Sequence, residues 1–157
     1  MMQKHKSKLM NALIAGIASM FTIGILAYLS TFHISTMILI VSFGATMVLL
    51  YGYPNNTFAH PKNIFFGHFI TALTGVVICS TFSGPLYLLT AISVGLGIFF
   101  MIALDVVHPP AGGNPIAVSL SNYSYDFLLE SIIPGLLVII SLGYIINNFI
   151  LNRKYPE

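Results

Sequence analysis

Charged residues are scarce in this chain of 157 residues: Asp, Glu, Lys and Arg together make up 6%, whereas 57% of the residues are hydrophobic. An average soluble domain carries roughly 25% charged residues, so this chain cannot cover a water-facing surface. The charges are also confined, because none occurs at positions 9–61, 63–104 or 131–152. Such long uncharged runs indicate an integral membrane protein surrounded by lipid.

Other scarcities exclude further classes of protein. The six basic residues are scattered near the ends of apolar runs, which argues against a nucleic-acid partner. The single cysteine, Cys79, cannot form an intrachain disulfide. No nucleophile elbow, phosphate-binding glycine loop or zinc signature is present. We therefore expect no metal, no cofactor and no enzymatic activity.

Four apolar runs have the roughly 20 residues that a helix needs to cross about 30 Å of hydrocarbon. They are residues 9–30, 64–82, 86–104 and 131–151. Residues 35–53 are also long enough, but the small, polar centre at 42–46 predicts a broken helix. Residues 109–120 contain three prolines and two adjacent glycines, which predicts an irregular start followed by about two turns of helix. The predicted fold class is therefore an all-α, polytopic transmembrane bundle in a single domain.

The positions of the basic residues predict the topology, because Lys and Arg concentrate on the cytoplasmic side. With all of them inside, the chain makes six crossings, the fifth short and irregular. Residues 1–8 and 153–157 are then cytoplasmic, and residues 9–152 form membrane helices and short loops. We expect the first apolar run to be retained as a helix, since it is longer than the apolar core of a signal peptide. The expected location is a bacterial plasma membrane. The basic residues are Lys4, Lys6, Lys8, Lys62, Arg153 and Lys154.

The six elements divide into two triplets, residues 9–82 and 86–151. Each triplet has a glycine-bearing middle element about 20 residues before its third helix. Three crossings per triplet give the halves opposite orientations, as in transporters built from inverted repeats with a site between interrupted helices. A 3+3 inverted repeat is therefore a hypothesis for this chain.

The segment 105–115, with the sequence DVVHPPAGGNP, combines three features. Adjacent prolines prevent a regular helix, adjacent glycines allow close approach of another backbone or a ligand, and an aspartate and a histidine are spaced one helical turn apart. Ionisable residues beside broken backbone at membrane depth predict a functional site. The candidates here are Asp105, His108, Pro109, Pro110, Gly112, Gly113 and Asn114.

The His-Pro-Pro tripeptide at 108–110, followed by Ala-Gly-Gly-Asn, resembles the signature of the HPP family of integral membrane proteins. An earlier block is similar to that family as well: SFGAT at 42–46, Pro54, AHPKN at 59–63 and the Gly-His pair at 67–68. The resemblance implies a multi-helix membrane protein of a family for which transport has been proposed, and plant and cyanobacterial relatives are associated with nitrite transport. His60 stands where many members have Gln, and Lys62 where many have Arg, which leaves the substrate open.

The residues themselves favour a small monovalent anion. In a site of low dielectric constant such an ion needs backbone N–H groups at a helix start, hydroxyl or amide donors, and a cation. We expect the 105–115 segment to provide the backbone N–H groups. A second set of candidates for substrate binding or translocation comes from earlier in the chain: Ser42, Gly44, Thr46, His60, Lys62, Asn63 and His68. Coupling to protons through His108 and Asp105 and an uncoupled channel both remain open.

Less specific interpretations stand beside this one. The histidines can hydrogen-bond neighbouring helices, Lys62 can act only as a topology determinant, and Gly44 and Gly112 can serve only close helix packing. A membrane enzyme that uses His108 with Asp105, or a non-transporting membrane subunit, is the alternative function. The expected partners are membrane lipid, a small anion and a second copy of the chain, since a chain of this size has little room to enclose a pore.

Overall fold

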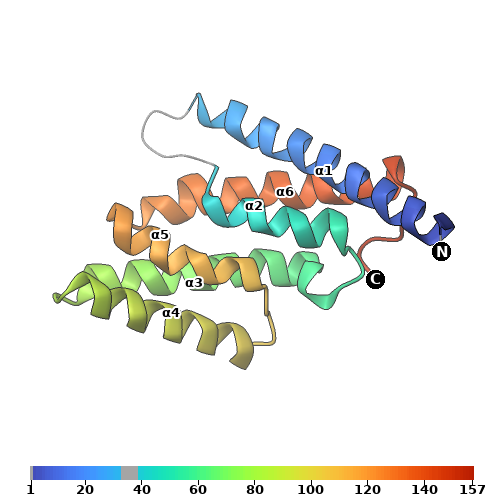
Figure 1. Ribbon diagram of the computed structural model, residues 1–157. Coiled ribbons are helices and arrows are strands. Elements are labelled where there is room, and N and C mark those ends of the chain that lie inside the picture. Colours follow the sequence, from blue (N-terminus) through green and yellow to red (C-terminus); the bar gives the residue numbers. More distant parts are fainter. Residues whose placement is uncertain (1, 33–38) are drawn as a thin grey trace.

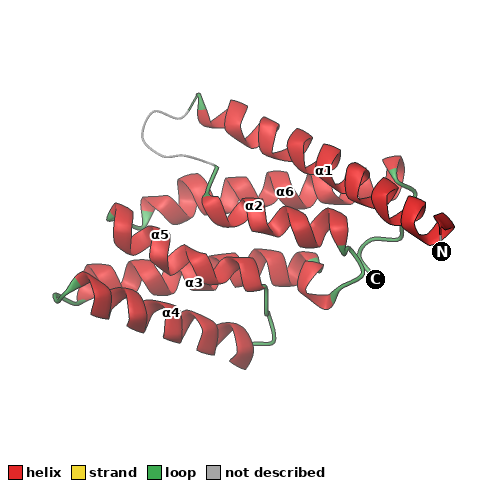
Figure 2. Cartoon of the chain, viewed as in Figure 1, coloured by secondary structure: helices red, strands yellow, loops and turns green. Residues whose placement is uncertain are grey.

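The computed structural model describes residues 2–32 and 39–157, with side chains from Lys8 onwards (Figure 1). Within these residues the regular secondary structure is all helical and includes no strand (Figure 2), which confirms the predicted class. The α-helices of this described part are α1 (Met2–Ser30), α2 (Val41–Met47), α3 (Pro61–Thr81), α4 (Leu86–Ala103), α5 (Asn114–Ser121) and α6 (Ile133–Ile145).

Single helical turns of other types extend or precede some of these helices. A π-helical turn, Val48–Gly52, continues α2, and two more, Leu128–Ile132 and Ile146–Ile150, lie at the two ends of α6. Turns of 3-10 helix occupy Thr57–Ala59 before α3 and Pro109–Gly113 before α5. Both short helices, α2 and α5, are thus joined to a turn of irregular helix.

Among the described residues, four helices are long and apolar enough to cross a membrane: Lys8–Ser30, Pro61–Thr81, Leu86–Ala103 and Leu128–Ile150. They correspond to the four runs predicted from the sequence. The helix Val41–Gly52 is apolar but shorter, and at 1.5 Å per residue it is roughly 18 Å long. Neither α2 nor α5 therefore has the length of a complete span.

Two details of the second element were predicted incorrectly. The span was expected to begin at Ser35, which lies outside the described residues, whereas the observed helix begins at Val41 after an extended Ile40 (φ −117°, ψ 153°). The interruption was expected at 42–46, but this stretch forms α2 itself. One glycine among helix-compatible residues costs only about 1 kcal/mol, so the helix can continue through Gly44. The element 109–120 is confirmed, since the prolines and glycines form a 3-10 turn and the helix α5 follows.

Successive helices run in alternate directions, and both chain ends lie at the same end of the bundle (Figure 1). The two triplets, α1 to α3 and α4 to α6, therefore run in opposite senses, as an inverted arrangement requires. Helices α2 and α5 lie between α1 and α4, in front of α3 and α6 (Figure 1). We call the end that holds Lys62, Asp105 and Arg153 the basic end, where the Lys62 ammonium donates to the Asp105 carbonyl (3.2 Å).

Close packing in the bundle depends on glycines of the long helices. A Cβ atom built on Gly67 of α3 would lie 2.8 Å from the Cβ of His108 and 3.0 Å from the carbonyl oxygen of Val106. A Cβ on Gly75, two turns further along α3, would lie 3.0 Å from the Cα of Pro115. These two glycines of α3 thus let the loop after α4 and the helix α5 lie directly on its backbone.

We predict that Gly67→Ala destabilises the protein by about 1–3 kcal/mol, because the added methyl meets a backbone carbonyl and a Cβ that cannot rotate away. The measurement is the thermal midpoint of the circular dichroism signal in mild detergent. Gly95→Ala is the matched control, since Gly95 lies inside α4 and a Cβ atom added to it would meet nothing within 4 Å. Equal midpoints for the two variants would contradict the prediction.

Candidate functional site

Polar side chains from four separate segments meet inside the bundle, where α2 packs against the 3-10 turn that precedes α5. Thr46, His68, Thr71, His108 and Asn114 are each at most 1% exposed, and Ser42 is half-buried. Because His68 is the eighth residue of α3, it lies roughly 10 Å along a membrane-spanning helix. We refer to these six residues as the polar cluster: Ser42, Thr46, His68, Thr71, His108 and Asn114.

The hydroxyl of Thr46 joins the two imidazoles. Its Oγ1 atom lies 2.9 Å from Nε2 of His68 and 2.9 Å from Nε2 of His108. The ring centroids of the two histidines are 4.9 Å apart. Since the three residues come from α2, α3 and the segment before α5, this single hydroxyl connects three parts of the fold.

The outer nitrogens of both imidazoles are also hydrogen-bonded. Nδ1 of His108 lies 2.6 Å from the carbonyl oxygen of Phe58, and Nδ1 of His68 lies 3.0 Å from the amide nitrogen of Asn114. The same amide nitrogen donates to the backbone carbonyl of His68 (3.0 Å) and to Thr71 Oγ1 (3.1 Å). The amide oxygen of Asn114 accepts from the Ser42 hydroxyl (2.6 Å). The cluster is therefore one continuous hydrogen-bonded chain from Ser42 to Phe58.

Local structure fixes the position of each histidine. The helix α3 begins regularly, with His60 as its N-cap and Pro61 at its first position, which is favourable for a proline. The helix α4 ends where Asp105 adopts a left-handed conformation (φ 52°), and the chain then turns so that His108 lies against Gly67. Phe58 is held by Asn56, whose side chain accepts from the Phe58 N–H group (2.9 Å).

Five of the predicted site residues are brought together: Ser42, Thr46, His68, His108 and Asn114. The prolines at 109 and 110 lie beside them and shape the 3-10 turn that precedes α5. Their roles in binding or translocation remain predictions, but the residues do form one connected group although they are far apart in the sequence.

The predicted pairing of Asp105 with His108 is wrong. One helical turn of spacing would join them only if the helix continued, and α4 ends at Ala103. Asp105 is exposed at the surface while His108 is fully buried. The left-handed residue at 105 ends the helix and separates the two side chains.

The predicted cations also lie outside the polar cluster. Lys62 is exposed, and Nδ1 of His60 accepts from the Lys62 N–H group at the start of α3 (3.2 Å). Asn63 is buried but donates to the Thr57 carbonyl (2.9 Å) and so holds the preceding loop. These three residues organise the basic end of the bundle.

Gly44, Gly112 and Gly113 do not provide close packing, because a Cβ on any of them would meet nothing within 4 Å. Two members of the hydrogen-bonded chain were missed from the sequence, Thr71 and the Phe58 carbonyl. Thr71 follows His68 by three residues on α3, which puts both on one helix face, so its position was recognisable. A backbone carbonyl carries no sequence signal.

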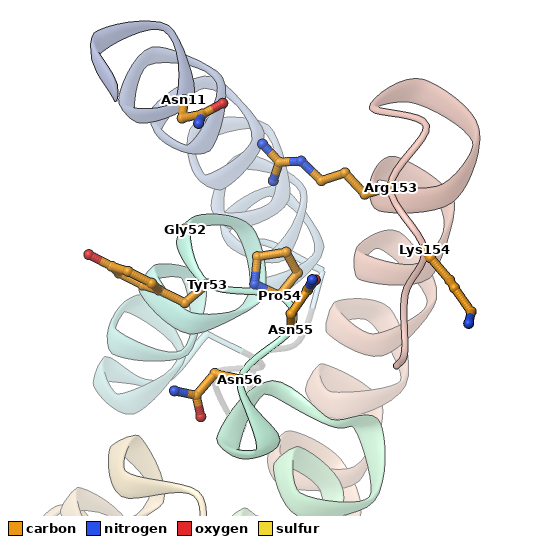
Figure 3. Close-up of a pocket in the computed structure, with 8 residues that line it drawn as sticks. All are labelled: Asn11, Gly52, Tyr53, Pro54, Asn55, Asn56, Arg153 and Lys154. Atoms are coloured by element: carbon orange, nitrogen blue, oxygen red, sulfur yellow. The ribbon is translucent and has the colours of Figure 1, made fainter. Parts of the chain in front are cut away.

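A second polar feature lies at the basic end, where a cavity of about 640 Å³ opens between α1, the loop after α2 and the segment after α6 (Figure 3). The guanidinium of Arg153 extends over this cavity and donates to the Tyr51 carbonyl (2.9 Å). Tyr155 holds the segment after α6 near the same loop, because its hydroxyl donates to the Ala59 carbonyl (2.7 Å). Burial raises the pKa of this phenol. We call this cavity the basic mouth. Its lining residues are Asn11, Gly52, Tyr53, Pro54, Asn55, Asn56, Arg153 and Lys154.

The family model described as "HPP, transmembrane region" matches residues 4–156. The chain belongs to the HPP family. This HPP protein is similar to two curated proteins of Dictyostelium discoideum, both named only as transmembrane proteins. One is 27% identical over 150 residues, covering 91% of this chain and 53% of the relative, and the other is 28% identical over 141 residues, covering 85% and 45%. This chain thus spans about half the length of these relatives. No solved structure matches it.

We predict that Asn114→Ala destabilises this HPP protein, because it leaves the Ser42 hydroxyl and Nδ1 of His68 without partners in a buried site. Each unsatisfied group costs about 1–3 kcal/mol. The thermal midpoint in mild detergent should fall clearly. Asn55→Ala is the control, since Asn55 is exposed in the loop after α2, where substitutions change stability by about 0.5 kcal/mol at most. An unchanged midpoint for Asn114→Ala would show that these hydrogen bonds do not hold the bundle together.

Proposed function

We propose that this HPP protein transports a small inorganic anion across a membrane, with the polar cluster as its binding site and nitrite as the first anion to test. The observation that carries the proposal is the continuous chain of buried hydroxyl, amide and imidazole groups inside a bundle of membrane helices. Such groups are costly to bury in a lipid-facing bundle, which favours a role beyond helix packing.

The chemistry of the cluster suits an anion. Its side chains offer O–H and N–H donors from Ser42, Thr46 and Asn114, and a carboxylate that would repel an anion is absent from it among the described residues. Donors of this type replace the hydration shell of a small anion. A cation would instead require an oxygen-rich site.

The two short helices supply a means of access. The cluster is closed in this structure, because both imidazoles are fully buried. Two side-chain hydrogen bonds, Ser42 to Asn114 and Thr46 to His108, join α2 to the segment that includes α5. Separation of these two pairs would open the cluster, as rocking of half-helices does in transporters of inverted-repeat architecture.

The position of the basic mouth supports an approach of anions from the basic end of the bundle. Arg153 and Lys154 line it, and a cavity lined by charges of one sign raises the local concentration of the opposite ion. The mouth borders the loop that carries Phe58, whose carbonyl contacts His108. By the distribution of basic residues, we place this end of the bundle and both chain ends at the cytoplasmic face.

The test is anion uptake into liposomes that contain the purified protein, with nitrite, nitrate, formate and chloride compared. We expect nitrite uptake above that of protein-free liposomes, and a loss of about tenfold or more in His68→Asn and His108→Asn, which lack the imidazole ring. His60→Asn is the matched control, because asparagine is also a favourable N-cap residue and His60 lies outside the cluster. Uptake close to the parent level is expected for this variant.

The alternatives predict other outcomes of this experiment. If folded protein takes up none of the four anions, the transport proposal is wrong, and a membrane enzyme or a non-transporting subunit becomes the better interpretation. If His60→Asn lowers uptake as much as the two cluster variants, the polar cluster is not the binding site. Circular dichroism melts of each variant separate these outcomes from unfolding.

The basic mouth gives a prediction of its own. Lys154→Gln should lower the apparent affinity for the anion by about twofold to tenfold at 10 mM salt, where the Debye length is about 30 Å, and much less at 0.15 M, where it is about 8 Å. Lys154→Arg keeps the charge and should behave like the parent protein. Concentration-dependent uptake at the two salt concentrations is the measurement, and an effect independent of salt would argue against electrostatic attraction.

A further inference from the structure

The hydrogen-bond partners determine where the protons of the polar cluster lie. The Phe58 carbonyl can only accept, so Nδ1 of His108 carries a proton and its Nε2 accepts when this imidazole is neutral. That Nε2 atom faces the Thr46 hydroxyl at 2.9 Å. The Thr46 hydroxyl therefore donates its hydrogen to Nε2 of His108.

The same argument settles His68. The amide nitrogen of Asn114 faces two further acceptors, the His68 carbonyl and Thr71 Oγ1, while its amide oxygen faces the Ser42 hydroxyl, which fixes the orientation of the amide. The amide nitrogen shares its two hydrogens among three neighbouring acceptors and cannot itself accept, so a proton on Nδ1 of His68 would face a donor. Neutral His68 therefore carries its proton on Nε2 and donates to Thr46. All donors of the chain thus point the same way, from Ser42 through Asn114, His68, Thr46 and His108 to Phe58.

This uniform direction prevents the closed cluster from conducting protons freely. A proton that entered at Nδ1 of His68 and left from Nδ1 of His108 would reverse both tautomers. His68 would then present an N–H group to the Asn114 amide N–H, and His108 would present a lone pair to the Phe58 carbonyl. Both contacts are repulsive in a buried site, so a proton can pass only if the contacts of Asn114 or Phe58 open.

The cluster can nevertheless hold one added proton. Thr46 Oγ1 has a second acceptor within reach, the backbone carbonyl of Ser42 at 3.1 Å. If His108 gains a proton on Nε2, the Thr46 hydroxyl can turn its hydrogen to Ser42 and accept from both imidazoles. The bond from Nδ1 of His108 to Phe58 is then unchanged. An added proton on Nδ1 of His68 would instead face the N–H group of the Asn114 amide, which cannot accept it.

We propose that the polar cluster takes up one proton on Nε2 of His108 together with one anion, with Thr46 as the hydroxyl that switches its hydrogen between His108 and the Ser42 carbonyl. This inference rests on the proposed anion transport and names its second substrate. The proton comes from solution and no bond other than the new N–H bond forms. Transport of a monovalent anion with one proton is electroneutral, so the membrane potential does not drive it.

The surroundings of the two histidines support this pairing. The ionisable side chains on the elements packed around them are engaged elsewhere or lie at the basic end, and none of these groups hydrogen-bonds either imidazole. A bound anion is therefore the counter-charge that offsets the cost of an imidazolium in a buried site. The groups are His60, Lys62 and Asp105 near the start of α3, Tyr51, which bonds to Thr22 (2.6 Å), and Tyr155, which bonds to Ala59.

The experiment uses the full chain in liposomes that enclose a pH-sensitive dye, with valinomycin and potassium setting the membrane potential. An inward nitrate gradient is applied, since nitric acid stays ionised and does not cross lipid unaided, and nitrite is tested in parallel. We expect internal acidification with one proton per anion and the same rate at zero and at negative-inside potential. Thr46→Val, which lacks the hydroxyl, should lose about tenfold or more of this coupled flux. Thr46→Ser keeps the hydroxyl and should retain it.

Each outcome has a distinct meaning. Anion uptake that follows the membrane potential without acidification overturns proton coupling and leaves the proposed transport intact. No uptake of nitrate or nitrite by folded protein overturns both. A second readout is independent of transport: nitrogen-15 resonances of labelled imidazoles should show nitrate promoting protonation of His108 at Nε2 and leaving Nδ1 of His68 unprotonated. Protonation of His68 instead would overturn the assignment of the added proton to His108.

Discussion

The buried chain of hydrogen bonds through Thr46 is the constraint on which the rest of the structure depends. A membrane interior offers no water to satisfy polar groups, so each must find a partner within the protein. Thr46, His68, His108 and Asn114 satisfy one another only if four separate segments approach within hydrogen-bond distance. The packing of α3 explains how they do so, because Gly67 leaves space for the backbone that carries His108.

The unequal helix lengths follow from the same constraint. A helix that crosses the whole bilayer satisfies its own backbone, whereas a helix end inside the bundle leaves backbone groups that need other partners in the protein. Helices α2 and α5 instead begin inside the bundle, where α2 packs against the 3-10 turn that precedes α5, while α1 and α4 flank them and α3 and α6 lie behind (Figure 1). The left-handed residue Asp105 and the prolines before α5 produce this geometry by ending one helix and delaying the next.

The sequence predicted the four long helices and the irregular start of α5, because charge-free length and prolines are strong local signals. It also identified Thr46, His68, His108 and Asn114, largely through the family resemblance. It could not show that Asp105 ends α4, since a left-handed aspartate and a helical one look alike in a sequence. Nor could it show that Lys62 stays at the surface, or that a carbonyl of Phe58 completes the cluster, because both depend on how distant segments pack.

The choice of histidine over lysine at the centre of the bundle has a physical consequence for the proposed transport. A buried ammonium would keep its charge and its cost when no anion is bound, so the empty site would resist closing. Two neutral imidazoles satisfied by Thr46, Asn114 and Phe58 close without a charge. A site that acquires its positive charge only when the anion arrives can close both loaded and empty, and alternating access requires both. Under the proposed transport, the polar cluster fits a carrier that cycles rather than a channel that stays open.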